Sequence, residues 1–211
     1  RNAVIITAIL SLISAGILIY YGVQGMPIQM LYFYIGLALL CIIAAITYTV
    51  GKKAYGYNGM GDIMVFLFFG LVSVLGVYSL FAKSFLIENV SLAIFVGLLS
   101  SAVLNLNNMR DYKNDAASGK KTIVVQMGPN NAKFYHALIL FIALISLAIF
   151  LNTFREPLLF LSMTPGILII IHLRKVMKTT QAKDFDPELK KVALTTFAIS
   201  IFVFIGLILT K

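Results

Sequence analysis

Apolar and polar positions follow one another in long blocks along this chain rather than in a short repeat. Seven apolar runs are each long enough to cross about 30 Å of hydrocarbon as a helix, and polar segments separate them. The pattern predicts an all-α fold, a polytopic transmembrane helix bundle that forms a single domain over residues 1–211. The predicted spans are residues 3–23, 29–50, 63–81, 90–109, 134–151, 157–173 and 192–210.

Composition agrees with a membrane protein and excludes several other classes. Of the 211 residues, 60% are hydrophobic and only 12% are charged, whereas about a quarter of the residues in a soluble domain are charged. We therefore expect the lipid bilayer, and not a nucleic acid, as a partner. The single cysteine, Cys41, lies in an apolar run, which excludes a disulfide or a cysteine metal cluster within this chain.

The basic residues are distributed unequally between the two sides of the predicted bundle. Of the 17 lysines and arginines, 14 lie at the start of the chain and in the longer loops, residues 51–62, 110–133 and 174–191. By the positive-inside rule these loops are cytoplasmic. For residues 174–191 two interpretations stay open. The charges either fix the topology and attract anionic lipid, or they contribute to a site.

The densest cluster of polar side chains lies in the middle of the chain, in residues 104–122. Its first half continues an apolar run and is predicted to be helical. Asn107, Asp111 and Asp115 are four residues apart, so they share one face, each step rising about 6 Å. An amide and two carboxylates at this spacing can hold Mg²⁺, which takes one or two carboxylates together with substrate phosphates.

The second half of this cluster predicts phosphate contacts. Gly119 breaks the helix, and Lys120 and Lys121 follow it with donors that suit phosphate oxygens. The alternative is an ordinary solvated loop beside a span. Asn105, Asn107 and Asn108 argue against it, because they precede the first charge and still lie inside the span, where amides are costly and indicate function.

Other polar positions give weaker signals. The loop over residues 48–62 is rich in glycine but is not a dinucleotide-binding fingerprint, since no strand precedes it. His136 and His172 fall near span ends, where a solvated imidazole is the ordinary expectation. Residues 184–188 read as the start of the last helix, with Pro187 in its first turn, rather than as a catalytic segment.

Residues 107–122 resemble the second aspartate-rich motif of the UbiA-type intramembrane prenyltransferases. Residues 48–62, followed by 65–70 and 74–76, are similar to the branch that prenylates dihydroxynaphthoate in menaquinone (vitamin K2) biosynthesis. The resemblance covers essentially the whole chain. It implies a Mg²⁺-dependent transfer of a polyprenyl group from its diphosphate to an aromatic acceptor, in a bacterial inner membrane with the active-site loops in the cytoplasm.

The resemblance also implies a role for each candidate residue. In this scheme an allylic carbocation forms as diphosphate departs, and a ring carbon of the acceptor attacks it. The catalytic residues would be Asp111, Asp115, Lys120 and Lys121; the metal ligands Asn107, Asp111 and Asp115; and the substrate-binding residues Asn107, Asn108, Arg110, Lys52, Tyr57 and Asp62.

This chain departs from the family pattern in two respects. The family has nine helices and a first motif of the Asn-Asp-x-x-Asp type, so we expect that motif and about two helices upstream of Arg1, with residues 1–211 as an N-terminally incomplete domain. Lys52 and Ala54 replace prolines that are frequent in the branch. The sequence leaves the prenyl length, the certain identity of the acceptor and the oligomeric state open.

Other classes of function compete with a prenyltransferase. A transporter also uses intramembrane carboxylates, but they are expected deeper in the spans, and no inverted repeat is evident. An alcohol phosphotransferase uses paired aspartates in a longer pattern that this sequence lacks. The open alternative is a membrane transporter, or a non-catalytic membrane subunit, with a cation-binding carboxylate pair.

Overall fold

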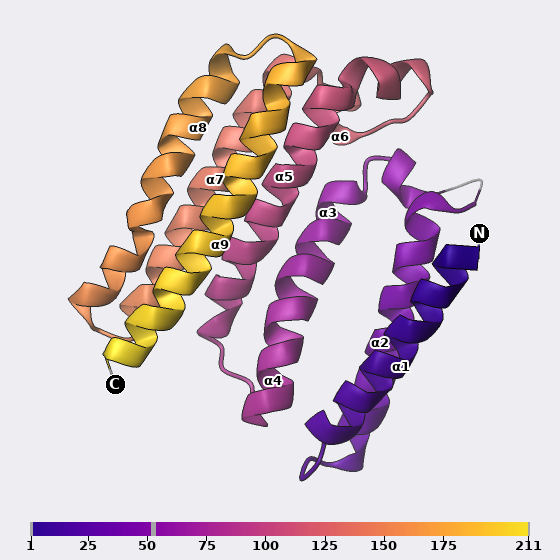
Figure 1. Cartoon of the computed structure of the whole chain (residues 1–211), viewed down its shortest axis with the longest axis vertical. Coiled ribbons are helices and arrows are strands. Elements are labelled where there is room, and N and C mark those ends of the chain that lie inside the picture. The colour runs from indigo at the N-terminus through magenta and orange to yellow at the C-terminus, as the bar shows by residue number, and fades with distance from the viewer. Residues whose placement is uncertain (1, 52–53, 211) are drawn as a thin grey trace.

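The chain forms a bundle of antiparallel helices in a computed structural model that describes residues 2–51 and 54–210 (Figure 1). Within these residues the regular secondary structure is entirely helical, and seven helical segments are long and apolar enough to cross a membrane, which confirms the predicted fold class. The elements are α1 (Asn2–Gly22), α2 (Ile28–Thr49), η1 (Tyr55–Tyr57), α3 (Gly61–Val65), η2 (Phe66–Leu75), α4 (Gly76–Ala82), α5 (Asn89–Ala117), α6 (Ile123–Met127), α7 (Pro129–Asn152), η3 (Pro157–Gly166), α8 (Ile167–Lys178), η4 (Ala182–Phe185) and α9 (Asp186–Leu209).

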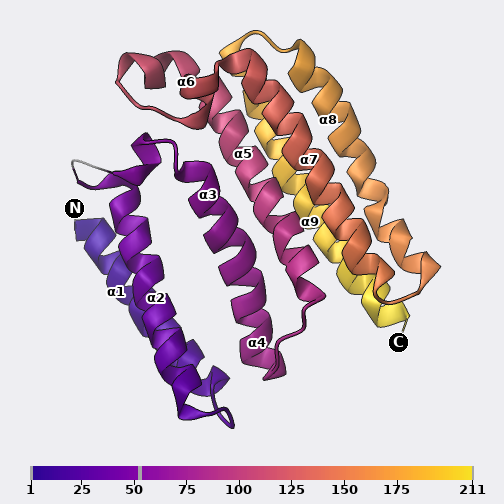
Figure 2. The same cartoon turned by 180° about the vertical axis from the view of Figure 1, so that it is seen from behind.

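Helix α5 occupies the middle of the bundle. Figures 1 and 2 show α7, α8 and α9 on one side of it, and α3, η2 and α4 on the other, with the α1–α2 hairpin at the edge. The main core joins α5, α7, η3, α8 and α9, and Leu99, Leu106, Leu147, Leu159 and Ile199 are fully buried in it. Most apolar side chains of α1 and α2 are exposed, as suits a surface in contact with lipid.

Several helices extend beyond the ends of the predicted membrane spans. Helix α5 continues past the predicted span end at residue 109 to Ala117, as the predicted helical face of Asn107, Asp111 and Asp115 requires, and α9 begins at Asp186, within the predicted helix start at residues 184–188. Hydropathy marks only the part of a helix that lies in hydrocarbon, whereas a helix satisfies its own backbone hydrogen bonds and can continue past the membrane edge. Two other predictions are confirmed: Gly119, with φ +75°, follows the end of α5, and Pro187 lies in the first turn of α9.

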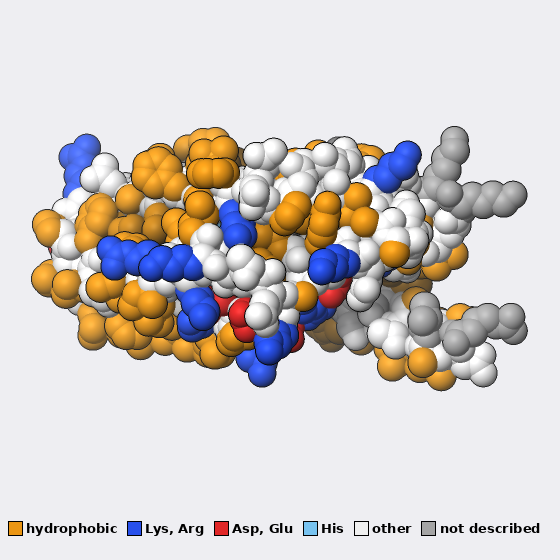
Figure 3. Space-filling model, turned by 90° about the horizontal axis from the view of Figure 1, so that it is seen from above, with side chains coloured by type: hydrophobic (Ala, Val, Ile, Leu, Met, Phe, Trp, Pro, Cys, Tyr) orange, Lys and Arg blue, Asp and Glu red, His pale blue; other side chains and the backbone are white. Residues whose placement is uncertain are grey.

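The longer polar connections gather at one end of the bundle. The start of α1 and the links α2–α3, α5–α7 and α8–α9 all lie at the upper end in Figure 1. Figure 3 looks onto this end and shows lysine and arginine side chains around a small group of acidic ones. The α1–α2, α4–α5 and α7–η3 links lie at the opposite end. The longer basic loops therefore lie on one side of the bundle and the short links on the other, as the charge pattern predicted.

The third span crosses α5 at very close range. Its middle part, η2, is a π-helical segment, and Gly70 of η2 lies against Gly97 of α5. A Cβ added to Gly70 would lie 2.6 Å from the Gly97 Cα atom, and one added to Gly97 would lie 2.9 Å from the carbonyl oxygen of Phe66. The two backbones are thus in direct contact, which is typical of small residues at helix interfaces in membranes.

We expect Gly97→Leu, or Gly70→Leu, to destabilise the bundle. The added side chain meets backbone that cannot give way, and overpacking of this kind typically costs about 1–3 kcal/mol. Thermal unfolding in detergent should show a lower melting temperature for each variant. The matched control is Gly36→Leu in α2, where an added Cβ meets no atom within 4 Å. Equal melting temperatures for Gly97→Leu and Gly36→Leu would contradict the prediction.

Candidate functional site

The candidate site is organised around Arg110 at the polar end of α5. The guanidinium binds Asp111 through two bonds, from Nε to Oδ1 at 2.8 Å and from Nη2 to Oδ2 at 2.9 Å. Nη2 also donates to Asn107 Oδ1 at 2.7 Å, and Nη1 donates to Asp186 Oδ1 at 2.9 Å. Arg110 therefore ties α5 to the first residue of α9.

Asp115 has a different cation as its partner. Its carboxylate is buried, and Lys120 Nζ lies 2.9 Å from its Oδ1 atom. The chain turns back at Gly119, and the Lys120 backbone N–H donates to the Asp115 carbonyl at 3.0 Å. The pKa of Lys120 is raised, chiefly by the hydrogen bond to Asp115, with a smaller attraction from Asp111. The Lys120 ammonium is thus close enough to both aspartates to be influenced by each.

The predicted stripe of Asn107, Asp111 and Asp115 is divided between these two cations. Arg110 holds the first two side chains and Lys120 holds the third. Asn108, which was predicted to bind substrate, is buried on another face of α5. Asn107 rather than Asn108 therefore lies beside the two acidic residues, in the register that the spacing favours.

The loop between α2 and α3 lies against Lys120 and Lys121. Lys120 Nζ is 5.2 Å from the centre of the Tyr57 ring, within the range of a cation–π contact. The Lys121 backbone N–H donates to the Tyr57 carbonyl at 2.8 Å. Tyr57 therefore borders the candidate site. Lys52 lies outside the described residues.

Asp62 lies behind the site rather than in its opening. Its side chain is 3% exposed, Ser101 Oγ donates to its backbone carbonyl at 3.0 Å, and Tyr135 of α7 lies next to its carboxylate. Among the described residues, Asp62 Oδ2 and the whole side-chain amide of the fully buried Asn105 have no hydrogen-bond partner. Buried polar groups without partners are costly, so this cluster is a second polar feature of the same region.

An apolar cavity opens next to the Arg110 cluster. It has a volume of about 430 Å³ and lies between η2, α5 and α9, with Asn107 as its link to Arg110. Its walls are mainly apolar, including Phe69, Val103 and Leu189. The cavity thus joins a charged end to an apolar slot, as a ligand with an anionic head and a hydrocarbon tail requires.

A second cavity of about 610 Å³ lies on the other side of η2. Tyr48, Tyr55 and Phe68 give it aromatic walls, and Val65 and Phe69 line this cavity as well as the first. The Tyr48 hydroxyl lies beside Gly61, whose other neighbour is Leu104 in the wall of the first cavity. The two cavities are therefore neighbours that share one wall.

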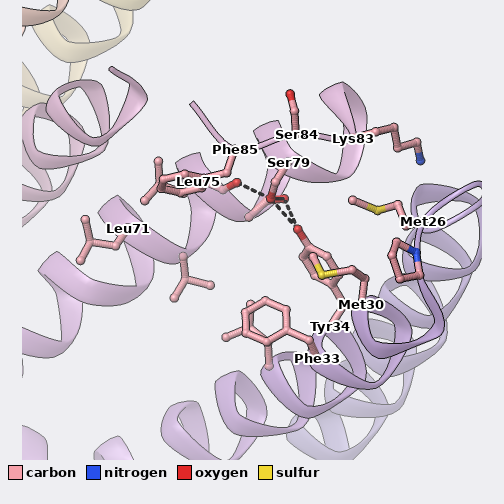
Figure 4. A pocket seen from close by; sticks show the side chains of 14 residues that line it. Met26, Met30, Phe33, Tyr34, Leu71, Leu75, Ser79, Lys83, Ser84 and Phe85 are labelled. Atoms are coloured by element: carbon pink, nitrogen blue, oxygen red, sulfur yellow. Dashed lines mark hydrogen bonds between the residues drawn. The ribbon is translucent and has the colours of Figure 1, made fainter. Parts of the chain in front are cut away.

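A third cavity, of about 670 Å³, lies at the opposite end of the bundle (Figure 4). Its polar feature is the Tyr34 hydroxyl, 2.5 Å from Ser79 Oγ. Lys83 lies at its edge and donates to the carbonyl of Gly22. It is the largest of the three, but it is lined by no acidic residue and does not include the chemistry around Arg110.

The residues of the site fit a metal that arrives with phosphate. Carboxylate and amide oxygens are the donors that Mg²⁺ prefers, and it commonly takes one or two carboxylates plus phosphate oxygens. Asp111, Asp115 and Asn107 match that set. Within the described residues, no group of three or more His, Cys, Asp or Glu side chains is arranged to hold a metal by itself. Phosphate oxygens would therefore have to complete the coordination.

Sequence reasoning missed Asp186 and misjudged two histidines. Asp186 was interpreted only as part of a helix start, yet it binds Arg110 from 76 residues away. Its position at the same membrane end as Arg110 was the available signal. The expectation that His136 and His172 are solvated was wrong, because they are 0% and 1% exposed and bonded to each other.

Comparisons with known proteins show a family and several relatives of this chain. The model of the UbiA prenyltransferase family matches residues 1–191. The chain is 37% identical, over 97% of its length and 66% of the relative, to 1,4-dihydroxy-2-naphthoate octaprenyltransferase of Haemophilus influenzae. It is 39% identical, over 82% of its length and 56% of the relative, to the protein of the same name in Escherichia coli. Human UbiA prenyltransferase domain-containing protein 1 is 28% identical over 44% of this chain and 27% of the human protein.

The chain thus spans between about half and two thirds of the length of the bacterial relatives. No solved structure was found to match it. The family match covers most of the chain, including the Arg110 cluster and Lys120. From this match, the chain belongs to the UbiA prenyltransferase family.

Proposed function

We propose that this chain is the larger part of an enzyme that transfers a polyprenyl group from polyprenyl diphosphate to an aromatic acceptor. The proposal rests on the position of Asn107, which binds Arg110 in the charged cluster and also lines the apolar cavity. One side chain thus marks the junction at which a diphosphate would meet its hydrocarbon tail. The names of the bacterial relatives support dihydroxynaphthoate, in menaquinone biosynthesis, as the acceptor.

The diphosphate would bind between the two ion pairs. Lys120, Lys121 and Arg110 would contact phosphate oxygens, and Asp111, Asp115 and Asn107 would hold Mg²⁺. When bound, Mg²⁺ supplies positive charge that stabilises the diphosphate as the allylic C–O bond breaks. The fixed cations of the chain add to the same stabilisation in a site with little water.

We also propose where the acceptor binds. The second cavity has aromatic walls and shares Val65 and Phe69 with the first, so a ring in it would lie across one wall from the prenyl tail. Aromatic rings prefer edge-to-face or offset contacts with other rings. We assign this cavity to the acceptor. The contacts of Tyr57 and Asp62 would hold the segment between α2 and α3 around both substrates.

We expect Asp111→Asn and Asp115→Asn to abolish most prenyl transfer by the complete gene product. Each change keeps the size of the side chain but removes a charge that would bind Mg²⁺, which should lower the rate on the order of a hundredfold or more. Asp111→Asn should change folding little, because the ion pair with Arg110 is partly exposed and such pairs contribute roughly 1 kcal/mol or less. The Asp115 carboxylate is buried, so Asp115→Asn should lower the melting temperature by more than Asp111→Asn does. Transfer is measured with and without Mg²⁺ in detergent or lipid, alongside the melting temperature.

The matched control is Glu156→Gln, the same carboxylate-to-amide change on an exposed side chain at the opposite end of the bundle. It should keep normal turnover. Normal turnover in both aspartate variants, with Mg²⁺ still required, would place the metal elsewhere and reduce this cluster to a structural feature.

The acceptor assignment makes a second prediction. Membranes that contain the complete protein should prenylate dihydroxynaphthoate at least about tenfold faster than 4-hydroxybenzoate, because a fused ring fills more of an apolar cavity than a single ring does. Product formation from the two acceptors is compared at equal concentration with the same prenyl diphosphate. The reverse preference would keep the reaction class and disprove the acceptor.

We further propose that the protein lies in a bacterial inner membrane with the Arg110 end in the cytoplasm. The charge bias supports this orientation. In a variant without Cys41, an impermeant thiol reagent added to intact cells should label Glu156→Cys and leave Lys178→Cys unlabelled; both side chains are exposed. Labelling of Lys178→Cys from outside would reverse the orientation.

A further inference from the structure

Three buried side chains from three helices form a hydrogen-bonded chain beside the candidate site. His136 of α7 and His172 of α8 lie with their Nε2 atoms 2.8 Å apart, and His172 Nδ1 lies 2.7 Å from Oε2 of Glu188 in α9. The three side chains are at most 1% exposed. Lys191 Nζ donates to the other oxygen of Glu188 at 2.6 Å, so these buried hydrogen bonds continue to a side chain at the surface.

The chemistry of the groups gives each bond a direction. A carboxylate only accepts hydrogen bonds, so His172 donates from Nδ1 to Glu188. A neutral imidazole carries one N–H, so His172 Nε2 accepts, and His136 donates to it from Nε2. Within the part of the chain that the structure describes, His136 Nδ1 has no partner and ends the sequence of bonds.

Glu188 and the site residue Asp186 share the first turn of α9. Successive residues of a helix are about 100° apart, so these two side chains leave the helix about 200° apart, on opposite faces. Asp186 binds Arg110 of α5, whereas Glu188 binds His172 of α8. The first turn of α9 is therefore held from both sides, by the site and by the buried histidines.

We propose that His136, His172 and Glu188 are positioning residues that fix the rotation of α9 and so place Asp186 against Arg110. Apolar packing of Val192, Ile199 and Val203 holds the body of α9, whereas hydrogen bonds of fixed length and direction restrict the rotation of its first turn. Removing the bonds lets the first turn of α9 rotate, and the guanidinium loses its partner on α9. This inference rests on the proposed function, in which Arg110 and its neighbours bind the diphosphate.

The test compares His172→Leu, His172→Asn and Asp186→Asn in the complete protein. Asparagine can place an N–H where His172 Nδ1 lies, so it should keep the bond to Glu188, whereas leucine cannot. We expect His172→Leu to raise the KM for polyprenyl diphosphate about tenfold, with little change in the KM for the acceptor. His172→Asn should stay within about twofold of the wild type.

A double variant separates positioning from general damage. If His172 acts through Asp186, then adding His172→Leu to Asp186→Asn should change the KM little beyond the effect of Asp186→Asn alone. Ile199→Ala, also fully buried in α9, controls for lost core packing; it should lower the melting temperature but leave the KM for the diphosphate unchanged. A full additional effect of His172→Leu in the double variant, or an equal rise in KM with Ile199→Ala, would overturn the proposal.

A second readout does not depend on turnover. Mg²⁺ with inorganic diphosphate should raise the melting temperature of the wild type and of His172→Asn more than that of His172→Leu. Lack of prenyl transfer by the wild type would disprove the proposed function. The shifts in melting temperature would still test whether His136 and His172 position the diphosphate site. Equal shifts in His172→Leu and the wild type would disprove the positioning role.

Discussion

The geometry of the candidate site depends on how one guanidinium is satisfied at the edge of the membrane. Arg110 cannot lose its charge, and an unpaired charge beside hydrocarbon is costly. Its four hydrogen bonds to Asp111, Asn107 and Asp186 offset that cost and restrict the positions of the three partner side chains. These bonds hold the first residue of α9 against the polar end of α5 and turn Asn107 toward the same guanidinium.

Close packing of the third span completes the site from the other side. The contact between Gly70 and Gly97 brings η2 against α5, and the same segment presents Val65 and Phe69 to both cavities. Larger residues at the two glycines would move this shared wall away from α5. The apolar walls and the polar cluster thus have separate causes, backbone contact in the bundle and ion pairing at its edge, and they meet at Asn107.

The sequence was sufficient for the fold because a membrane span is a local property of about twenty residues. It also placed the aspartates on one helix and the break at Gly119, since both follow from local spacing. The pairing of Arg110 with Asp186 could not be predicted in this way, because it depends on which helices pack together. The same applies to His136 and His172, whose burial follows from the neighbours of α7 and α8.

Pairing within the cluster explains how a site for a highly charged ligand can exist before that ligand binds. Arg110 and Lys120 neutralise Asp111 and Asp115, so the cluster presents little net charge to the adjoining apolar cavity. In the proposed function, a metal on the aspartates would take the place of these cations and leave them free to contact phosphate. The ion pairs then disfavour metal binding without diphosphate, because the positive charge of the metal alone would lie beside two cations with no anion to balance it. Metal and diphosphate should therefore bind together, with the positions of Arg110 and Asp186 linking that event to the first turn of α9.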